Sequence, residues 1–572
     1  MEEIDGFQES MKEKYVRVKE LIDIKHTKDP DDEPYRSKYL ARDILKEMET
    51  SIKERNECGI KEKSMLTAVY TLLGTICMDV DEPVSGEEYL HKSLKLVETE
   101  ECSDYFILST LCTLNQLALL YSMRQEDEKA LVYLERADNL YNEYKELKTV
   151  SPLGYHFLFT NDKDTCDEKG KEMFEKTHTL TFYYMAQVFK AMGNTIESAV
   201  FCHNTLRRQL ETNDYDKIDW ALNSASLSQY FTEQNAFKEA RHHLAAASYM
   251  LSLKKKELDD IVDKNEEYEA SLEQYNHRKS DVYRCWIKYC LSLLSRSKDR
   301  LMASDEDGAN VIKVTPASLI NKRFPSLQID ANENMVTADY LLTYYDAKPV
   351  VLFAQSCVNK ATEYYTLEDH ASDYVLIIQD SSQLYLFLAF FEEDESKQCK
   401  LHKKRKDLLM KTVSELNETY YLDVCRELWL ELGLICSSIA EIKSLQFSQN
   451  SSAHTATKLN NTLQVSLNFL LKYINSFINK RTNKMPDRFP LEYERDALMA
   501  HLCTAQAYSK FVNCDKNKII DYTKQSLHYY QAIVNYCKEY PDSTKGFQAE
   551  LGICKDMVTL LPVKMNKLAL QG

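Results

Sequence analysis

The stretches LALLYSMRQEDEKALVYLERA (residues 117–137) and LSQYFTEQNAFKEARHHLAAA (227–247) decide the fold class. Each has a small residue, an apolar or aromatic residue three positions on, and then a small, a large and a small residue on a second helix. Paired helices that cross closely need small residues where their backbones approach and large residues beside them. The spacing predicts the helix–turn–helix unit of tetratricopeptide repeats.

Two weaker copies of the pattern lie in phase with the first two, at residues 72–94 and 185–205. Amphipathic helices share single matches, but four in phase indicate a repeat array. The pattern positions, copy by copy, are Gly74, Cys77, Gly86, Leu90 and Ser93; Ala118, Tyr121, Ala130, Leu134 and Ala137; Ala186, Phe189, Ser198, Cys202 and Thr205; and Ser228, Phe231, Ala240, Leu244 and Ala247.

Composition agrees with an all-α chain. Only 12 glycines and 11 prolines occur among 572 residues, and sheet proteins need these residues at their turns. The length exceeds what one compact core accommodates, so several domains or an extended array are expected. We therefore predict a solenoid of tetratricopeptide-like helix pairs.

The repeats are not uniformly spaced. Ser151–Glu172 contains Pro, Gly, Asn and Asp and is expected to interrupt the helical period. Leu251–Ser297 is expected to form one long helix, charged up to Asp281 and apolar after it. Ser304–Asn334 loses periodicity and is expected to be a linker or a mobile loop between two halves.

The second half has a weaker repeat signal. Residues 427–436 and 503–508 carry small and large residues at the offsets of a first repeat helix, and residues 526–537 supply a following helix. The polar run Gln446–Thr457 is expected to be a surface loop. The last helix is expected to end near Leu560–Pro562 because proline disfavours a helix interior.

Net charge and cysteine usage indicate the cellular compartment and the kinds of partner to expect. The chain has 72 basic and 89 acidic side chains, a net charge of −17, which disfavours nucleic acid and anionic lipid. The charge favours a basic partner, with solubility alone as the alternative. No C-x-x-C occurs, the N-terminus lacks a secretory signal, and apolar runs such as Val375–Phe391 are interrupted by polar residues. We expect a cytoplasmic protein with reduced thiols that does not span or bind a membrane.

Enzyme signatures for phosphate, dinucleotide, serine-hydrolase or zinc chemistry do not occur. His242–His243 and Cys202–His203 are interpreted as packing residues, so we predict no enzyme, no metal and no cofactor. Lys400–Lys406 (KLHKKRK) is interpreted as a solvated helix face, with a phosphate site or nuclear signal as the alternative.

The candidate partner-binding residues lie on the expected inner surface of the array. Tyr184 and Gln187 are three residues apart and so share one side of a helix, and Asn223 and Ser226 repeat this spacing on the next first-type helix. Aromatic side chains with polar tips are typical interface anchors. Packing between repeats is the alternative interpretation for each of them.

The sequence resembles the KIF-binding protein (kinesin-binding protein) family along nearly its whole length. The resemblance is carried by long, irregular segments in the order of the family. They are EPYRSKYLARDILKE, SGEEYLHKSLKLV, YLERADNLYNEY, FYYMAQVF, CHNTLRRQLE, WALNSASLSQY, EARHHLAAA, RCWIKYCLSLL, IIQDSSQLYLFLAFFEEDESKQCKLHKKR, LHYYQAIVNYC and DMVTLLPVKM.

This resemblance implies a right-handed α-solenoid in two halves joined by a linker helix. Residues 1–250 would form the motor-binding half, 251–340 a linker helix with a flexible acidic loop, and 341–572 the C-terminal half. The partners implied are the motor domains of a subset of kinesins.

Binding would block attachment of these motors to microtubules and so regulate axonal and mitotic transport and neuronal development. The implied protein is a cytoplasmic, cytoskeleton-associated monomer that binds one-to-one and meets microtubules only through the motors. The contact residues that the resemblance implies are Tyr184, Gln187, Gln209 and Ser226.

Two alternatives belong to other classes. A generic tetratricopeptide adaptor would bind short C-terminal peptides through a Lys and Asn clamp, and Tyr184, Gln187, Asn223 and Ser226 do not form one. A helical enzyme would need paired carboxylates or metal ligands, which the sequence does not display.

Overall fold

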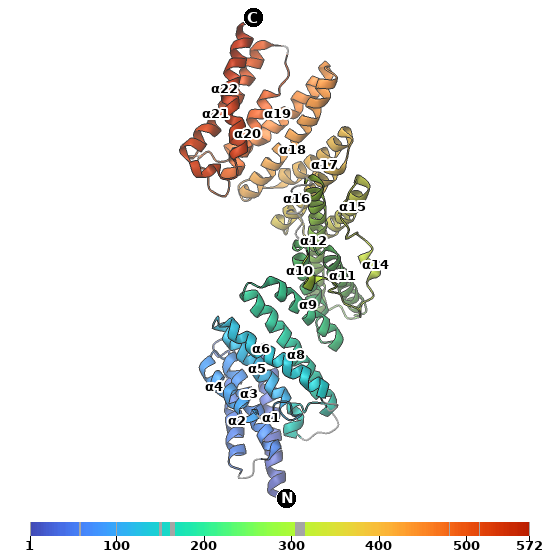
Figure 1. The fold of residues 1–572 in the computed structure, drawn as a ribbon, viewed down its shortest axis with the longest axis vertical. Coiled ribbons are helices and arrows are strands. Elements are labelled where there is room, and N and C mark those ends of the chain that lie inside the picture. The colour runs from blue at the N-terminus through green and yellow to red at the C-terminus, as the bar shows by residue number, and fades with distance from the viewer. Residues whose placement is uncertain are drawn as a thin grey trace. The chain divides into compact units, whose positions relative to one another are not determined.

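A computed structural model describes residues 2–55, 59–98, 100–147, 151–160, 166–303, 315–479, 481–513 and 515–570. Within these ranges the regular elements are helices, and a single β-bridge joins Asn479 and Lys484 (Figure 1). Contacts divide the chain into a first unit, Met1–Lys254 with Val314–Ile329, and a second unit, Lys255–Lys313 with Asp330–Gly572. The predicted all-α fold class is confirmed.

The first unit is a succession of antiparallel helices. Its elements are α1 (Glu2–Asp23), η1 (Lys25–Lys28), α2 (Arg36–Lys53), α3 (Ile60–Asp79), α4 (Pro83–Val97), α5 (Ile107–Met123), α6 (Asp127–Leu147), α7 (Tyr155–Thr160), α8 (Cys166–Ala191), α9 (Thr195–Thr212), α10 (Lys217–Glu233), most of α11 (Phe237–Asp259) and η2 (Ala317–Leu319).

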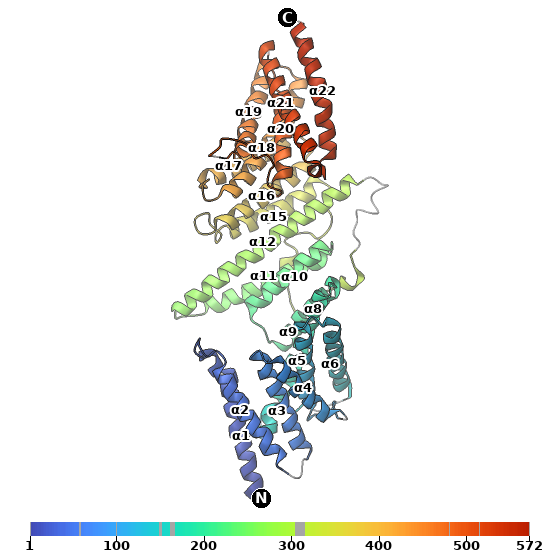
Figure 2. The same ribbon diagram turned by 90° about the vertical axis from the view of Figure 1, so that its left-hand side faces the viewer.

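The second unit begins at Lys255, near the end of α11, and continues with another set of helices. They are α12 (Glu266–Met302), α14 (Asp330–Glu333), α15 (Tyr344–Ala361), α16 (Ala371–Phe391), α17 (Glu395–Glu415), α18 (Leu422–Gln449), α19 (Ala453–Asn475), α20 (Glu494–Ser509), α21 (Lys516–Glu539), η3 (Pro541–Thr544) and α22 (Gln548–Leu570). Figure 2 shows the same helices from a second side.

The four sequence repeats are the helix pairs α3/α4, α5/α6, α8/α9 and α10/α11. Each pair is joined by the same turn, in which the residue seven positions after the first small residue has a positive φ. The next amide donates at 2.8–2.9 Å to the carbonyl of the apolar or aromatic residue three positions after that small residue. This is the six-to-one bond of a Schellman cap. The positive-φ residues are Asp81, Gln125, Gly193 and Asn235.

The small pattern residues do allow helices to cross closely. A Cβ added to Gly74 would lie 2.6 Å from the side chain of Leu90, and one added to Gly86 would lie 3.2 Å from the carbonyl oxygen of Gly74. In the third pair the Ser198 hydroxyl donates to the carbonyl of Ala186 at 2.8 Å. A side chain at Gly74 would therefore displace Leu90, and one at Gly86 would crowd the Gly74 carbonyl.

The second unit uses the same device. A Cβ on Gly433 of α18 would lie 2.5 Å from the side chain of Leu470, and Ser466 of α19 donates to the Gly433 carbonyl at 2.9 Å. On the next pair Ser526 donates to the carbonyl of Ala505 at 2.8 Å. The weak repeat signal of the second half thus still marks helix crossings.

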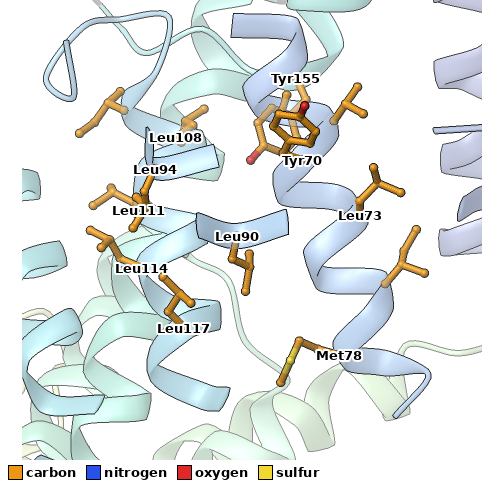
Figure 3. Close-up of a cluster of buried hydrophobic side chains, with 14 of the residues drawn as sticks. Tyr70, Leu73, Met78, Leu90, Leu94, Leu108, Leu111, Leu114, Leu117 and Tyr155 are labelled. Atoms are coloured by element: carbon orange, nitrogen blue, oxygen red, sulfur yellow. The ribbon is translucent and has the colours of Figure 1, made fainter. Parts of the chain in front are cut away.

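The core of the first unit is a layer of aliphatic side chains between paired helices. Figure 3 shows residues of α3, α4, α5 and α7 that face one another across this layer. Leu73, Leu90, Leu111, Leu114 and Leu117 are each fully buried. Burying a leucine stabilises the fold by about 1.5–3 kcal/mol, so this layer contributes much of the stability of the unit.

The prediction of one helix over Leu251–Ser297 is wrong. α11 ends at Asp259, residues 260–265 are not helical, and α12 begins at Glu266. The Asn265 side chain accepts from the Tyr268 amide at 2.9 Å and caps α12. α12 packs against α15 and α16 of the second unit. The assignment of 251–340 as a linker between halves stays a prediction.

The expected loop Ser304–Asn334 is ordered over most of its described part. Residues 304–314 lie outside the described residues, and residues 315–329, here called the strap, belong to the first unit. The amide of Phe324 donates to His242 Nε2 at 2.8 Å, and the amide of Asn321 donates to Glu239 Oε1 at 3.0 Å. The strap is therefore held by hydrogen bonds to α11, and the expectation of a linker or a mobile loop stays a prediction.

Three local expectations need correction. α18 and α19 cover most of Gln446–Thr457, because a Ser452–Thr455 capping box starts α19 early. α22 runs through Pro562 to Leu570, and the buried Leu561 beside the proline keeps this turn packed. Within Ser151–Glu172, α7 forms and α8 already begins at Cys166.

One described helix, α16, is long and apolar enough to cross a membrane by length and composition. In its most apolar window 56% of the residues are buried inside the protein. Core helices pass the same test, so this is weak evidence for a membrane span.

Candidate partner-binding surface

α8 has one face in the core and a second face outside it. Phe174, Met185 and Val188 are buried, and they hold the helix against the preceding pairs. Tyr183 and Gln187 on the second face are exposed. The exposed face of α8 therefore presents an aromatic ring and an amide that the fold does not cover.

Tyr184 is half-buried and packs against the core of the first unit. Its ring centroid lies 5.7 Å from that of Tyr183, and burial raises the pKa of its hydroxyl, with Tyr183 adding to the effect. Among the described residues its hydroxyl has no hydrogen-bond partner. Tyr184 thus has a packing role and a hydroxyl without a hydrogen-bond partner among the described residues.

Gln209 is half-buried near the end of α9. Its backbone carbonyl accepts from the amide of Asp214 at 3.2 Å, across a turn in which Asn213 has a left-handed conformation. The preceding Arg208 is buried, and its guanidinium donates 2.6 Å to Glu175 on α8 and 3.3 Å to the hydroxyl of Tyr141 on α6. This ion pair fixes the last turns of α9 and hence the position of Gln209.

Asn223 and Ser226 are exposed on one side of α10, as their spacing predicts. The opposite side of α10 is anchored: the Trp220 indole donates to the Leu206 carbonyl at 3.0 Å, and Ser224 donates to the His243 carbonyl at 2.9 Å. The exposed pair is therefore held on a helix whose rotation is fixed by its neighbours.

The structure brings the predicted residues together in pairs. Tyr184 and Gln187 share a face of α8, and Asn223 and Ser226 share a face of α10, while α9, which carries Gln209, packs against both helices. Among the described residues, no hydrogen bond joins these three groups. Their exposed amides, hydroxyls and aromatic edges can form hydrogen bonds and apolar contacts with another protein.

Sequence reasoning missed two neighbours on α8. Leu180 is 48% exposed and Tyr183 is 47% exposed, so both add apolar surface to the exposed side of α8. The signal was present in the sequence, because Leu180, Tyr183 and Gln187 follow helical spacing on a side distinct from the core positions.

His203 and His243, which the sequence indicates as packing residues, contact each other and the strap. His203 Nδ1 lies 3.0 Å from His243 Nε2, and the ring of Phe324 stacks on His203 with centroids 4.9 Å apart. Over the described part of the chain, no group of three or more His, Cys, Asp or Glu side chains is arranged to hold a metal ion.

Comparison with known proteins identifies the family. Residues 218–568 match the family described as KIF-1 binding protein C terminal. The chain belongs to the KIF-binding protein family. The KIF-binding protein of Gallus gallus is 34% identical over 586 residues, and that of Homo sapiens is 30% identical over 610, with 97% of both chains covered in each case. The resemblance stated from sequence is confirmed.

A solved structure entitled "Cryo-EM structure of KIFBP core" is 31% identical to this chain. The match covers 49% of this chain and 89% of that one, with a TM-score of 0.32. A KIF-binding protein of Xenopus tropicalis is 32% identical over 609 residues and 98% of both chains.

Proposed function

We propose that this chain binds the motor domains of a subset of kinesins and prevents them from attaching to microtubules. The observation that carries the proposal is the family relationship, because relatives named KIF-binding protein match over nearly their whole length. The chain would act as a non-catalytic, stoichiometric inhibitor, a cytoplasmic monomer that binds one-to-one and regulates axonal and mitotic transport.

The contact surface proposed is Tyr184, Gln187, Gln209, Asn223 and Ser226, extended by Tyr183. The exposure of Gln187, Asn223 and Ser226 supports it. Exposed aromatic residues beside amides are typical of interface centres. These side chains contain no Lys–Asn clamp, which disfavours the alternative of an adaptor for C-terminal peptides.

Charge supports the same partner. A kinesin motor domain presents a basic face to acidic tubulin, and a chain of net charge −17 would compete for that face and associate faster through electrostatic steering. Binding should therefore weaken as salt rises from about 50 to 300 mM. An affinity and an association rate that stay constant over this range would remove the charge argument.

Microtubule co-sedimentation of several kinesin motor domains, with and without this chain, tests the proposal. We expect some motors to leave the pellet and elute with the chain as a one-to-one complex on gel filtration. If every motor stays on the microtubules and none binds the chain in solution, the proposal fails.

A further inference from the structure

The basic run Lys400–Lys406 in α17 divides between two sides of the helix. Arg405 is buried and donates to the Ser382 hydroxyl at 3.2 Å and to Glu431 at 3.4 Å. Lys403 is exposed and Lys406 is half-buried. The interpretation of the whole run as a solvated face is therefore wrong for Arg405, which is a structural residue, and leaves Lys403 and Lys406 to be explained.

Lys403 and Lys406 line a hollow of about 270 Å³ together with lysines from two further helices. Lys443 comes from α18 and Lys458 from α19, and both helices lie in the second unit with α17 (Figures 1 and 2). Asn461 and Thr462 add an amide and a hydroxyl to the wall. Every charged side chain in this lining is positive.

Nearby carboxylates do not neutralise this cluster. Asp407 contacts Lys406 at 3.4 Å, but its own side chain is 71% exposed, so water screens the pair. Glu441, on α18, accepts instead from Lys510 at 3.1 Å. Among the described residues, Lys403, Lys443 and Lys458 have no carboxylate partner.

Lys443 is the most constrained of the four. It is half-buried, and its ammonium donates to the Lys458 backbone carbonyl at 3.2 Å and to the Thr462 hydroxyl, which aims it at the wall of the hollow. Burial lowers the pKa of Lys443, and the charges of Lys403, Lys406 and Lys458 lower it further. Holding these four cations close together costs free energy that a bound anion would offset.

We propose that this hollow binds a compact polyphosphate anion. Lysine ammonium groups bind phosphate as point charges, and the Asn461 amide and the Thr462 hydroxyl add neutral hydrogen-bonding groups. The volume lies just below the range of about 300–1,000 Å³ for small-molecule sites, which suits a small, highly charged ligand.

The lining contains no aromatic ring, so nucleobases have no stacking platform there. The acidity of the whole chain opposes a long polyanion such as nucleic acid. The ligand chemistry is thus a cluster of phosphates on a small scaffold, which a soluble inositol polyphosphate or a phosphoinositide headgroup both supply. This inference is independent of the proposed kinesin binding.

Isothermal titration of the full chain with inositol hexakisphosphate, in about 0.1 M salt, tests it. The test variant is Lys403→Gln with Lys458→Gln, because both side chains are exposed and the fold does not depend on them. The matched control is Lys400→Gln with Lys411→Gln, which changes the charge equally on α17 outside the hollow.

We expect saturable one-to-one binding that weakens about tenfold or more in the test variant and less than about twofold in the control. Sedimentation with vesicles containing phosphatidylinositol 4,5-bisphosphate separates the sources. Binding to these vesicles without binding to the soluble ligand, lost in the same variant, assigns the site to a lipid headgroup. Absence of both kinds of binding, or equal losses in the two variants, overturns the proposal.

Discussion

Two surfaces of the first unit have similar composition, but one is covered by another segment of the chain and the other is exposed. The surface of α9, α10 and α11 around His203, Trp220 and His242 is covered by the strap, whose Phe324 is buried among those rings. The second face of α8, with Tyr183 and Gln187, is exposed. Aromatic and polar residues on a repeat helix therefore do not by themselves indicate a partner; what matters is whether the chain already covers them.

Substitutions in the covered surface should lower the free energy of unfolding more than substitutions in the exposed surface. Phe324→Ala removes a fully buried ring and is expected to lower the free energy of unfolding by about 3–5 kcal/mol. Ile320→Ala is the matched control, because Ile320 lies on the same strap but is 49% exposed. Urea unfolding monitored by circular dichroism measures both, and equal, small effects would contradict the packing role of the strap.

Loss of the Arg208–Glu175 pair should have the next largest effect. Glu175→Ala leaves the buried Arg208 without its carboxylate and is expected to cost about 3 kcal/mol. Glu172→Ala is the control, because its side chain is 59% exposed on the same helix and pairs with Lys176. Thermal unfolding of the two variants makes the comparison, and a Glu175→Ala melting curve that matches the control would show that the pair is dispensable.

Acid should lower the free energy of unfolding through the histidines of the covered surface. Burial, with the charges of Lys322 and Arg207, lowers the pKa of His203 from 6.5 to about 3, and burial also lowers the pKa of His243. The unfolded chain therefore takes up protons first, so stability is lost as the pH falls below about 6.5.

For His203 alone the expected loss between pH 6.5 and pH 5 is about 2 kcal/mol. Urea unfolding at the two pH values measures it, and His203→Phe should reduce the dependence on pH. If the free energy of unfolding depends on pH equally in the wild type and in the variant, His203 is not the source of the acid sensitivity.

Substitutions on the exposed face of α8 should change the free energy of unfolding least. Tyr184→Phe with Gln187→Ala keeps the half-buried ring in place and removes only polar groups without described partners. We expect the free energy of unfolding to change by less than about 0.5 kcal/mol. Thermal unfolding checks this, and a loss of several kcal/mol would mean that the face serves the fold.

The helix pairs were predictable from sequence because their signal is local. Small residues at Gly74, Ala118, Ala186 and Ser228 set the crossings, and each turn follows at a constant distance. The strap was not predictable, because the Phe324–His242 contact joins residues 82 positions apart and leaves no periodic trace. Capping residues inside polar runs likewise concealed the start of α19.

For the candidate surface, helical spacing placed Gln187, Asn223 and Ser226 on exposed faces of their helices, as the structure has them. Spacing could not reveal that Tyr184 is half-buried, because its burial depends on side chains of other helices. The role of these residues in binding a partner stays a prediction.

The measurement that tests the account most directly is the affinity of a kinesin motor domain for three proteins: the wild type, Tyr184→Phe with Gln187→Ala, and Ile320→Ala. We predict that the α8 variant binds at least about tenfold more weakly while its unfolding is unchanged, and that Ile320→Ala binds as the wild type does. Equal affinity of the wild type and the α8 variant would contradict the claim that this open face receives the motor.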